Sequence, residues 1–339
     1  MSCASPLKAF QYIDTRTGEL SGLCFKSDLD LRGFLSWRKD DPTIIKHLLP
    51  CGQCAECRSD RAHEWANRLT LEAELYPGQS WFLTLTYDDD HLPRTGRKVL
   101  DRETGVVGDL PVVDADDISR FMKTLRKRSA RKYRFFGVTE YGDLSRRPHV
   151  HIILFGELPD LQMYRYGVDG AVLLPPNTYH SDLVEECWNK GLISVQEANS
   201  FAMSYVAGYA VKKLKGKLNQ SYLAECKALG ADPQPAESAR MSRRPGIAGT
   251  WAQIHSSECE SGTVAVPTPQ GAFLAPVPRL FESRIDPDAV AAFKARRSAQ
   301  GDARLSRIDQ LRPSDYLERV IKIKADQKRK MKQKRSQKV

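Results

Sequence analysis

From residue 81 to residue 198, the hydrophobic positions change between the period of a strand and the period of a helix. Two stretches place apolar side chains three or four residues apart: one after Asp116, with Ile118, Phe121 and Leu125, and a shorter one after Ser181. Four other segments have the β-branched and aromatic composition of strands, and they span residues 81–87, 133–139, 148–155 and 191–196. The predicted order is β-α-β-β-α-β.

This order is the split pattern that folds as a ferredoxin-like antiparallel sheet. We therefore expect an α+β fold with the helices on one face of the sheet. In that topology the first and third strands are central, and the second strand pairs with the third. Residues 148–155 should then lie in the middle of the sheet, where a strand is held rigidly from both sides.

The flanking sequence predicts further elements. A helix with Trp65 and Leu69 on one face precedes the first strand, and another runs from about Asn199 to Lys215. Beyond Gly216 the pattern weakens, and four prolines between 262 and 280 predict an extended crossing. We expect four regions: an N-terminal region with a cysteine cluster (1–57), the core (58–216), an extension packing on the core (217–312), and a basic helical or disordered tail (313–339).

The formal net charge of +10 is concentrated at the C-terminal end of the chain. Residues 322–339 carry nine Lys or Arg and one Asp, so the rest of the chain contributes only +2. A polycationic tail is typical of proteins that bind nucleic acid, although it is also compatible with a solvated end. No apolar run reaches about 18 residues and no signal-peptide pattern begins the chain, so we expect a soluble intracellular protein with no membrane partner.

A second basic region follows the helix that begins near Asp116. Residues 120–134 contain eight basic side chains, and no acidic residue occurs from 118 to 139. A solvated helix face usually interleaves acids, so this composition favours contact with DNA or RNA phosphates. The residues expected to contact nucleic acid, together with two arginines of a later turn, are Arg120, Lys123, Arg126, Lys127, Arg128, Arg131, Lys132, Arg243 and Arg244.

Three of the eight cysteines lie close together, as Cys51, Cys54 and Cys57. This spacing suits metal ligation better than a framework of secreted disulfides. A tetrahedral structural zinc site needs a fourth ligand, and Cys24 or Cys3 could supply it. Reduced thiols in a turn and an iron–sulfur cluster are the alternatives.

The strand at 148–155 carries His149 and His151, which alternation places on the same side, about 6–7 Å apart. Its hairpin partner ends near Glu140, whose carboxylate can reach the start of the histidine strand. One carboxylate and two imidazoles, with positions left for water, suit Mg²⁺ or Mn²⁺. Two half-exposed polar positions on a strand are the simpler interpretation of the same pattern.

Tyr205 and Tyr209 stand one turn apart on one face of a predicted helix, and Lys212 and Lys213 continue that side. A tyrosine hydroxyl, with a pKa near 10, attacks a phosphodiester only if a cation stabilises the developing charge. A nearby lysine favours the ionised phenol. The pair could instead be core packing, but a metal triad and a basic ridge in the same chain favour catalysis.

These motifs together resemble the His-hydrophobe-His (HUH) endonucleases that initiate rolling-circle replication, in the two-tyrosine form of the microviruses. The gokushovirus branch is the most similar. The matching segments are Pro148-His-Val-His151, Tyr205-Val-Ala-Gly-Tyr209-Ala-Val-Lys-Lys213, Pro50-Cys-Gly-Gln-Cys-Ala-Glu-Cys-Arg58, Phe82-Leu-Thr-Leu-Thr-Tyr87, Glu140-Tyr-Gly142 and Met241-Ser-Arg-Arg-Pro-Gly246. The resemblance extends in patches from about residue 50 to 250.

The resemblance implies a nickase of HUH fold that cuts one strand of circular phage DNA at the origin. One tyrosine becomes joined to the 5′ phosphate and leaves a 3′-OH for synthesis, and the second tyrosine later closes the circle. The implied partners are single-stranded and origin DNA and the host helicase and polymerase, in the bacterial cytoplasm. The chain has no Gly-x₄-Gly-Lys-Ser/Thr loop, so we expect no fused helicase.

Other functions remain compatible with parts of the sequence. A ferredoxin-like scaffold also suits a non-catalytic nucleic-acid-binding protein, because fold alone does not decide function. A phosphoesterase with two His-x-Thr/Ser motifs fits poorly, since only His255-Ser-Ser257 matches and it lies outside any strand pattern. A conjugative relaxase usually places its tyrosine before the histidines, which is the reverse of the order here.

Overall fold

The computed structural model describes residues 3, 7–12, 44–142, 145–163, 177–209, 211 and 217–309. The chain divides into two compact units. One unit is residues 58–290, and the other combines the described parts of 1–57 and 291–339. Within the described residues, no helix is long and apolar enough to cross a membrane.

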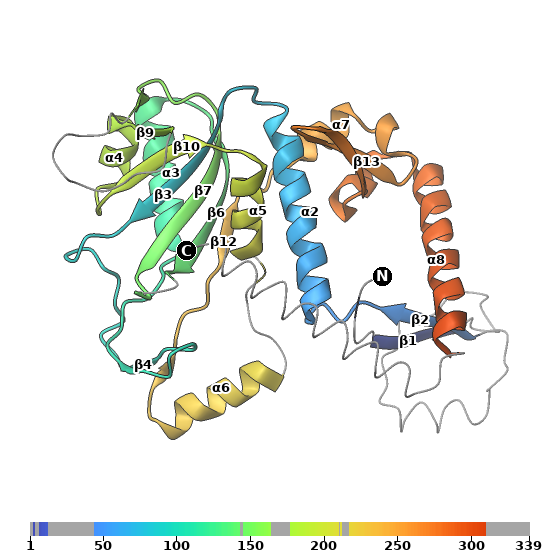
Figure 1. Ribbon diagram of the computed structural model, residues 1–339, viewed down its shortest axis with the longest axis horizontal. Helices are drawn as coiled ribbons and strands as arrows, with labels where there is room; N and C mark the ends of the chain where they lie inside the picture. Colours follow the sequence, from blue (N-terminus) through green and yellow to red (C-terminus); the bar gives the residue numbers. More distant parts are fainter. Residues whose placement is uncertain are drawn as a thin grey trace. The chain divides into compact units, whose positions relative to one another are not determined.

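A seven-stranded antiparallel sheet forms the centre of the larger unit (Figure 1). The strands, in their order across the sheet, are β12 (Ala239–Met241), β6 (Arg134–Tyr141), β7 (Pro148–Phe155), β3 (Ser80–Thr86), β10 (Ile193–Glu197), β9 (Thr178–His180) and β8 (Gln162–Met163). The predicted order β-α-β-β-α-β is present as β3-α3-β6-β7-α4-β10, but the sheet also contains β8, β9 and β12, which the sequence did not predict. β3 and β7 are central and β6 pairs with β7, as the split pattern predicts.

Two helices cover one face of this sheet: α3 (Asp116–Ser129) and α4 (Asp182–Trp188). The burial of β3 alternates, so Leu83 and Leu85 face these helices while Phe82 and Thr84 face the other side. The apolar stripe predicted for α3 packs against this face of the sheet. Ser181 caps α4 by accepting a hydrogen bond from the N–H of Val184 at 3.1 Å.

The expectation that helices lie on one face only is wrong. α5 (Ser200–Tyr209) and the part of α2 (Ala55–Ala73) within this unit pack on the opposite face (Figure 1). The physical reason is that β6 and β7 are apolar on both sides, with Phe136, Ile153 and Phe155 fully buried away from α3. A strand buried on both faces needs a covering layer on each.

Smaller elements complete the unit. They are β4 (Val99–Leu100), β5 (Val107–Gly108), α6 (Lys217–Ala228), β11 (Asp232–Pro233), α7 (Gly249–Ile254), η1 (Ser257–Cys259), β13 (Thr263–Thr268), β14 (Gly271–Pro276) and η2 (Arg279–Arg284). The segment 262–280, expected to be an extended crossing, contains the antiparallel hairpin β13–β14. Its prolines are compatible with pairing because each can lie at an edge, where no ladder donor is needed.

In the other unit, β1 (Leu7–Tyr12) pairs with β2 (Ile44–Leu49) in an antiparallel ladder that begins with Leu7 opposite Leu49. α8 (Pro287–Asp309) begins in the larger unit and continues into this one. The basic helical or disordered tail expected at 313–339 lies outside the described residues.

Candidate active site

The two histidines lie on β7 and point to the face of the sheet that α5 covers. Antiparallel pairing sets His149 opposite Glu140 of β6, and His151 opposite Thr84 of β3. The imidazole rings are parallel within 4°, with centroids 6.4 Å apart. This separation is the one predicted from the two-residue repeat, and Glu140 stands beside His149 in the register as the hairpin predicted.

Each histidine is held through its Nδ1 atom. Nδ1 of His149 lies 2.6 Å from the carbonyl oxygen of Arg147, and Nδ1 of His151 lies 3.2 Å from Oγ1 of Thr84. A carbonyl oxygen only accepts, so Nδ1 of His149 carries the hydrogen and Nε2 has the lone pair in the neutral ring. Burial lowers the pKa of His149 below its ordinary value, which favours this neutral form. An imidazole oriented in this way is typical of a metal ligand.

Glu140 is a buried carboxylate at the centre of the group. Its Oε2 atom lies 2.9 Å from Nε2 of His151 and accepts a hydrogen bond of 3.0 Å from the hydroxyl of Tyr205. Burial alone would raise the pKa of Glu140, but hydrogen bonds from His151, Tyr209 and Tyr205 outweigh it and lower the pKa below its ordinary value. The carboxylate is therefore anionic at neutral pH and suited to hold a cation.

The donor types fit a divalent cation, because an anionic carboxylate and two imidazole nitrogens are ligands of Mn²⁺ and related ions. The three ligand atoms are not gathered as closely as in a formed site. Among the described residues, two groups have all ligand atoms within 4.8 Å of one another, and Glu140, His149 and His151 are not one of them. Glu140 is turned to His151 and the tyrosines, so its side chain would have to reorient for the three residues to bind one cation.

Both tyrosines point into this group from α5. Tyr209 donates a hydrogen bond of 3.1 Å to the hydroxyl of Tyr205, which donates in turn to Glu140. The ring of Tyr205 meets that of His151 edge to face, with centroids 5.4 Å apart. Burial, followed by the bonds to Glu140 and Tyr205, raises the pKa of Tyr209 above its ordinary value. Lys212 and Lys213, expected beside them, lie outside the described residues.

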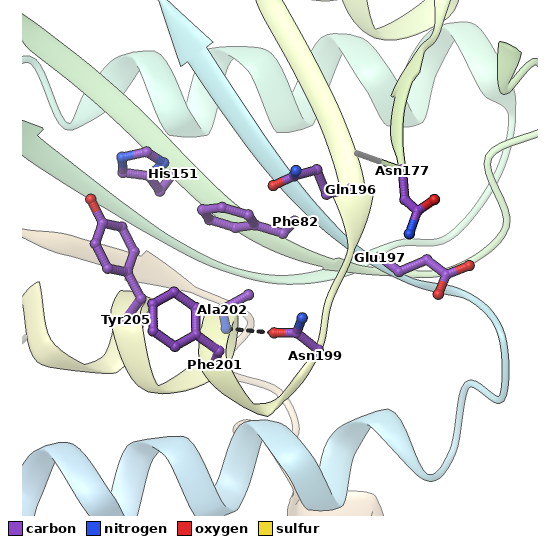
Figure 2. Close-up of a pocket in the computed structure, with 9 residues that line it drawn as sticks. All are labelled: Phe82, His151, Asn177, Gln196, Glu197, Asn199, Phe201, Ala202 and Tyr205. Atoms are coloured by element: carbon purple, nitrogen blue, oxygen red, sulfur yellow. Dashed lines mark hydrogen bonds between the residues drawn. The ribbon is translucent and has the colours of Figure 1, made fainter. Parts of the chain in front are cut away.

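A cavity of about 340 Å³ opens beside Tyr205 and His151 (Figure 2). Phe82 stacks on His151 with centroids 5.4 Å apart and forms part of the wall. Phe201, at the start of α5, is 73% exposed. Neither phenylalanine was a candidate from the sequence, although alternation along residues 81–87 could have placed Phe82 on the histidine face.

The expected DNA-contacting residues are not one continuous ridge. A hollow of about 740 Å³ gathers six of the chain's basic side chains, Arg126, Arg131, Lys132, Arg134, Arg243 and Arg244. Arg120 is paired with Asp114 and Asp117, and Arg128 with Glu186. No acid occurs between 118 and 139, but Glu186 and Glu157, from segments later in the chain, pair with Arg128 and Arg131. The hollow lies at Arg134, six residues before Glu140 on β6, which corresponds to roughly 20 Å.

In the smaller unit, the structure brings Cys51, Cys54 and Cys57 together with Cys3. Their four sulfur atoms all lie within 4.8 Å of one another. Cys24, the other candidate for a fourth ligand, lies outside the described residues.

The segment that contains this site matches a known family. Residues 80–214 match the family of the replication-associated protein ORF2, and this range includes Glu140, both histidines and both tyrosines. The site on the antiparallel sheet therefore lies within the segment that is similar to this family of replication-associated proteins.

Longer alignments relate the chain to proteins of individual phages. It is 29% identical over 248 residues to the replication-associated protein ORF2 of Spiroplasma virus 4, covering 72% of this chain and 69% of that protein. It is 27% identical over 285 residues to the replication-associated protein VP4 of Bdellovibrio phage phiMH2K, covering 81% and 82%. The replication-associated protein ORF4 of Chlamydia phage 1 is 32% identical over 201 residues, covering 58% and 45%. The resemblance to phage replication proteins is confirmed, and no solved structure matches the chain significantly.

Proposed function

We propose that this protein initiates rolling-circle replication of a circular phage DNA as an HUH-type nickase and strand transferase. The observation that supports the proposal best is the chain of contacts Tyr209–Tyr205–Glu140–His151. It joins two candidate nucleophiles to a carboxylate and an imidazole beside an open cavity. The family match over residues 80–214 supports a role in replication.

In the proposed reaction, a tyrosine oxygen attacks the phosphorus of one origin phosphodiester, and the bond from phosphorus to the 3′ oxygen breaks. The phenolic proton leaves with a water molecule, and the released 3′ oxygen takes up a proton to become the 3′-OH. The products are a 5′-phosphotyrosyl bond and a primer end for the host polymerase. In the joining step, a 3′-OH attacks the phosphotyrosine and releases the phenol, so no ATP is required.

Glu140, His149 and His151 would hold Mg²⁺ or Mn²⁺, which polarises the scissile phosphate. Glu140 has two conflicting tasks in this site. While its carboxylate accepts the hydrogen bond of Tyr205, its negative charge opposes ionisation of that phenol. The negative charge of Glu140 therefore has to be neutralised before the phenol attacks. A bound cation would neutralise it, so the phenol would be reactive only when the cation is present.

We assign the first cleavage to Tyr205. Its side chain borders the cavity, while Tyr209 is 8% exposed and is not among the residues that line the cavity. Tyr209 would act in the joining step, after Tyr205 carries the DNA and its hydrogen bond to Glu140 is lost. The basic hollow around Arg134 would bind phosphates of the single-stranded or origin DNA, and the host helicase and polymerase would act on the exposed strand in the bacterial cytoplasm.

The test is incubation of the full chain with a single-stranded origin oligonucleotide and Mn²⁺, followed by a denaturing gel. We expect a slow-migrating covalent adduct that EDTA prevents. Tyr205→Phe should abolish the adduct in the first cleavage, while Tyr209→Phe should retain it and lose joining. Tyr76→Phe is the matched control, since Tyr76 lies on the same face of the sheet against Phe155, at the other end of β7.

The second candidate is a non-catalytic nucleic-acid-binding protein on the same scaffold, for which the basic hollow is the supporting observation. This protein would bind the oligonucleotide with or without Mn²⁺ and form no adduct. Binding without any adduct, across oligonucleotides that cover the whole phage origin, would overturn the proposed nickase.

A further inference from the structure

The pairing of β1 with β2 brings Cys3 to the cysteine turn. Leu7 is opposite Leu49, so Cys3 lies four residues before Leu7 and Cys51 lies two residues after Leu49. Both cysteines therefore lie beyond the same end of the ladder. The fold thereby closes a loop of 47 intervening residues, a proximity that no local spacing could indicate.

The separation of the sulfur atoms has the scale of a metal site. The Sγ atoms of Cys54 and Cys3 are 3.8 Å apart, far beyond a disulfide bond. Zinc bound to four thiolates at about 2.3 Å places the sulfurs of its tetrahedron roughly 3.8 Å apart. The other pairs of the group are within 4.8 Å.

Backbone amides around the turn point at the sulfurs. The N–H groups of Gln53 and Cys54 donate to Sγ of Cys51, at 3.4 and 3.3 Å. The N–H of Cys57 donates to Sγ of Cys54 at 3.4 Å, and the N–H of Cys51 donates to Sγ of Cys3 at 3.3 Å. Hydrogen bonds of this kind stabilise the anionic form of a sulfur atom, which is the form that ligates metal.

We propose that Cys3, Cys51, Cys54 and Cys57 bind one structural zinc ion. Four protein ligands leave no open position, so the site is structural rather than catalytic. It ties the segment before β1 to the start of α2, beside the two-stranded ladder of β1 and β2. A two-stranded ladder is marginally stable in water by itself, and a metal supplies the missing stabilisation.

The test is metal analysis of the purified full chain, with variants at the two cysteines that could be the fourth ligand. We expect one zinc per chain in the wild type and in Cys24→Ser, and loss of zinc in Cys3→Ser. Cys3→His should retain the metal, because imidazole also ligates zinc, which separates a ligand role from a folding defect. Replacement by Co²⁺ should give the strong absorption of a tetrahedral cobalt–thiolate centre.

Zinc retained in Cys3→Ser but lost in Cys24→Ser would show that the fourth ligand is misassigned. Iron in place of zinc, or no metal in a chain prepared without chelator, would overturn the zinc site itself. None of these measurements depends on nicking activity.

A separate observation concerns the cavity beside Tyr205. Two phenylalanines and three amides contribute to its wall, which is formed by Phe82, His151, Asn177, Gln196, Glu197, Asn199, Phe201, Ala202 and Tyr205. Among the described residues, the wall has no lysine or arginine and one carboxylate, which suits an uncharged group better than a phosphate. Its volume of about 340 Å³ is within the range of roughly 300–1,000 Å³ found for small-ligand sites.

The side chains of the wall are arranged to stack and to hydrogen-bond. Phe201 presents a ring that is 73% exposed, and exposed rings are stacking platforms for the bases of single-stranded DNA. Gln196 donates from Nε2 to Thr178 at 3.2 Å, which fixes the orientation of its amide. In Figure 2 the phenol of Tyr205 points toward His151, and the carboxylate of Glu197 extends away from both.

We infer that this cavity holds one nucleobase next to the scissile phosphate, stacked on Phe201 and read by the amide of Gln196. The inference rests on the proposed function and adds the substrate feature that the site selects. A base held there fixes the position of the phosphate relative to Tyr205, so one position of the origin becomes a specificity determinant.

The test measures binding of fluorescent single-stranded oligonucleotides in EDTA, so it does not require cleavage. We expect Phe201→Ala to weaken binding about tenfold, the usual effect of losing one stacked base. Phe273→Ala is the control, since Phe273 is also exposed, at 48%, on the distant hairpin β13–β14. Removing the base at one position of the oligonucleotide should weaken binding by the wild type as much as Phe201→Ala does. The same abasic oligonucleotide should bind to Phe201→Ala no more weakly than the intact one.

If the loss of binding caused by Phe201→Ala adds to the loss caused by an abasic site at every position, no base occupies the cavity. Unchanged binding by Phe201→Ala would lead to the same conclusion. If no adduct forms but the two binding losses are non-additive, the proposed nickase is wrong and the base site is supported. If the adduct forms but the losses are additive, the nickase is supported and the base site is wrong.

Discussion

At the scale of single residues, the site depends on side chains that orient the histidines. Thr84 lies directly opposite His151 in the sheet and contacts its Nδ1 atom. Arg147 does the same for His149 through its backbone carbonyl, which no substitution of its side chain removes. The contact through Nδ1 keeps Nε2 of His151 aimed at Glu140, because an imidazole has only two polar atoms.

We therefore predict that Thr84→Val weakens Mn²⁺-dependent adduct formation without changing DNA binding in EDTA. Loss of such an orienting contact usually costs about 10- to 100-fold in metal affinity. The measurement is the Mn²⁺ concentration at half-maximal adduct yield. Thr124→Val, which alters an exposed hydroxyl on α3, serves as the control, and equal Mn²⁺ dependence of the two variants would contradict the role of Thr84.

A second prediction at this scale concerns Asp101, a buried carboxylate outside the site. Although burial alone would raise its pKa, backbone N–H groups, Arg146 and Gln234 lower the pKa of Asp101 to about 2. The folded pKa lies below the unfolded one, so the stabilisation is complete above about pH 4 and is lost as the pH falls toward 2. The free energy of unfolding should drop by about 2 kcal/mol across that interval.

Urea denaturation of the wild type and Asp101→Asn between pH 4 and pH 2 measures this loss. The variant should have a lower free energy of unfolding at pH 4 and a flatter pH dependence below it. Equal slopes for the two proteins would show that Asp101 does not account for the loss.

At the scale of elements, close packing between α3 and the sheet leaves no room for a side chain at one position. Gly137 of β6 lies directly under α3, and a Cβ atom there would be 2.9 Å from a methyl carbon of Ile118 and 3.3 Å from Ile152. Gly208 of α5 stands between the two tyrosines, yet a Cβ atom at this position would meet nothing within 4 Å. The same substitution should therefore have opposite effects in the two elements.

We expect Gly137→Ala to destabilise the protein by about 1–3 kcal/mol, because the helix has to shift away from the sheet. Gly208→Ala should stabilise α5 by up to about 1 kcal/mol, since alanine loses less backbone entropy in a helix. Urea denaturation midpoints compare the two directly. Destabilisation by Gly208→Ala would indicate that α5 is not a regular helix around the tyrosines.

At the scale of the whole molecule, residues 1–321 have a net charge of only +2, but the fold gathers basic side chains in one place, as a polyanion-binding surface requires. Arg243 and Arg244 come from a turn over a hundred residues after Arg126, and the fold sets all three around one hollow. The pairs Arg120–Asp114 and Arg128–Glu186 are exposed, and such pairs contribute little to stability. Phosphates could therefore compete for these arginines.

We predict that Arg243→Ala and Arg244→Ala each reduce the salt dependence of single-strand binding by about 0.7 in log–log slope, as expected for one lost phosphate contact. Arg97→Ala is the control, because Arg97 is exposed and pairs with Asp232 away from the hollow. Binding titrations at several salt concentrations give the slopes. Unchanged slopes in both hollow variants would exclude this surface from the DNA path.

The sequence by itself determined the features that arise from short periods. Alternation along 148–155 set both imidazoles on one face, helical spacing set Tyr205 beside Tyr209, and the order of elements set β7 in mid-sheet. These features depend on backbone geometry over a few residues, which local sequence fixes. Only the tertiary structure decided that Glu140 turns to His151, that helices cover both faces of the sheet, that Glu186 pairs with Arg128, and that Cys3 meets Cys51. Each of these is a contact between segments distant along the chain, and such contacts depend on how the elements pack rather than on any repeat within one of them.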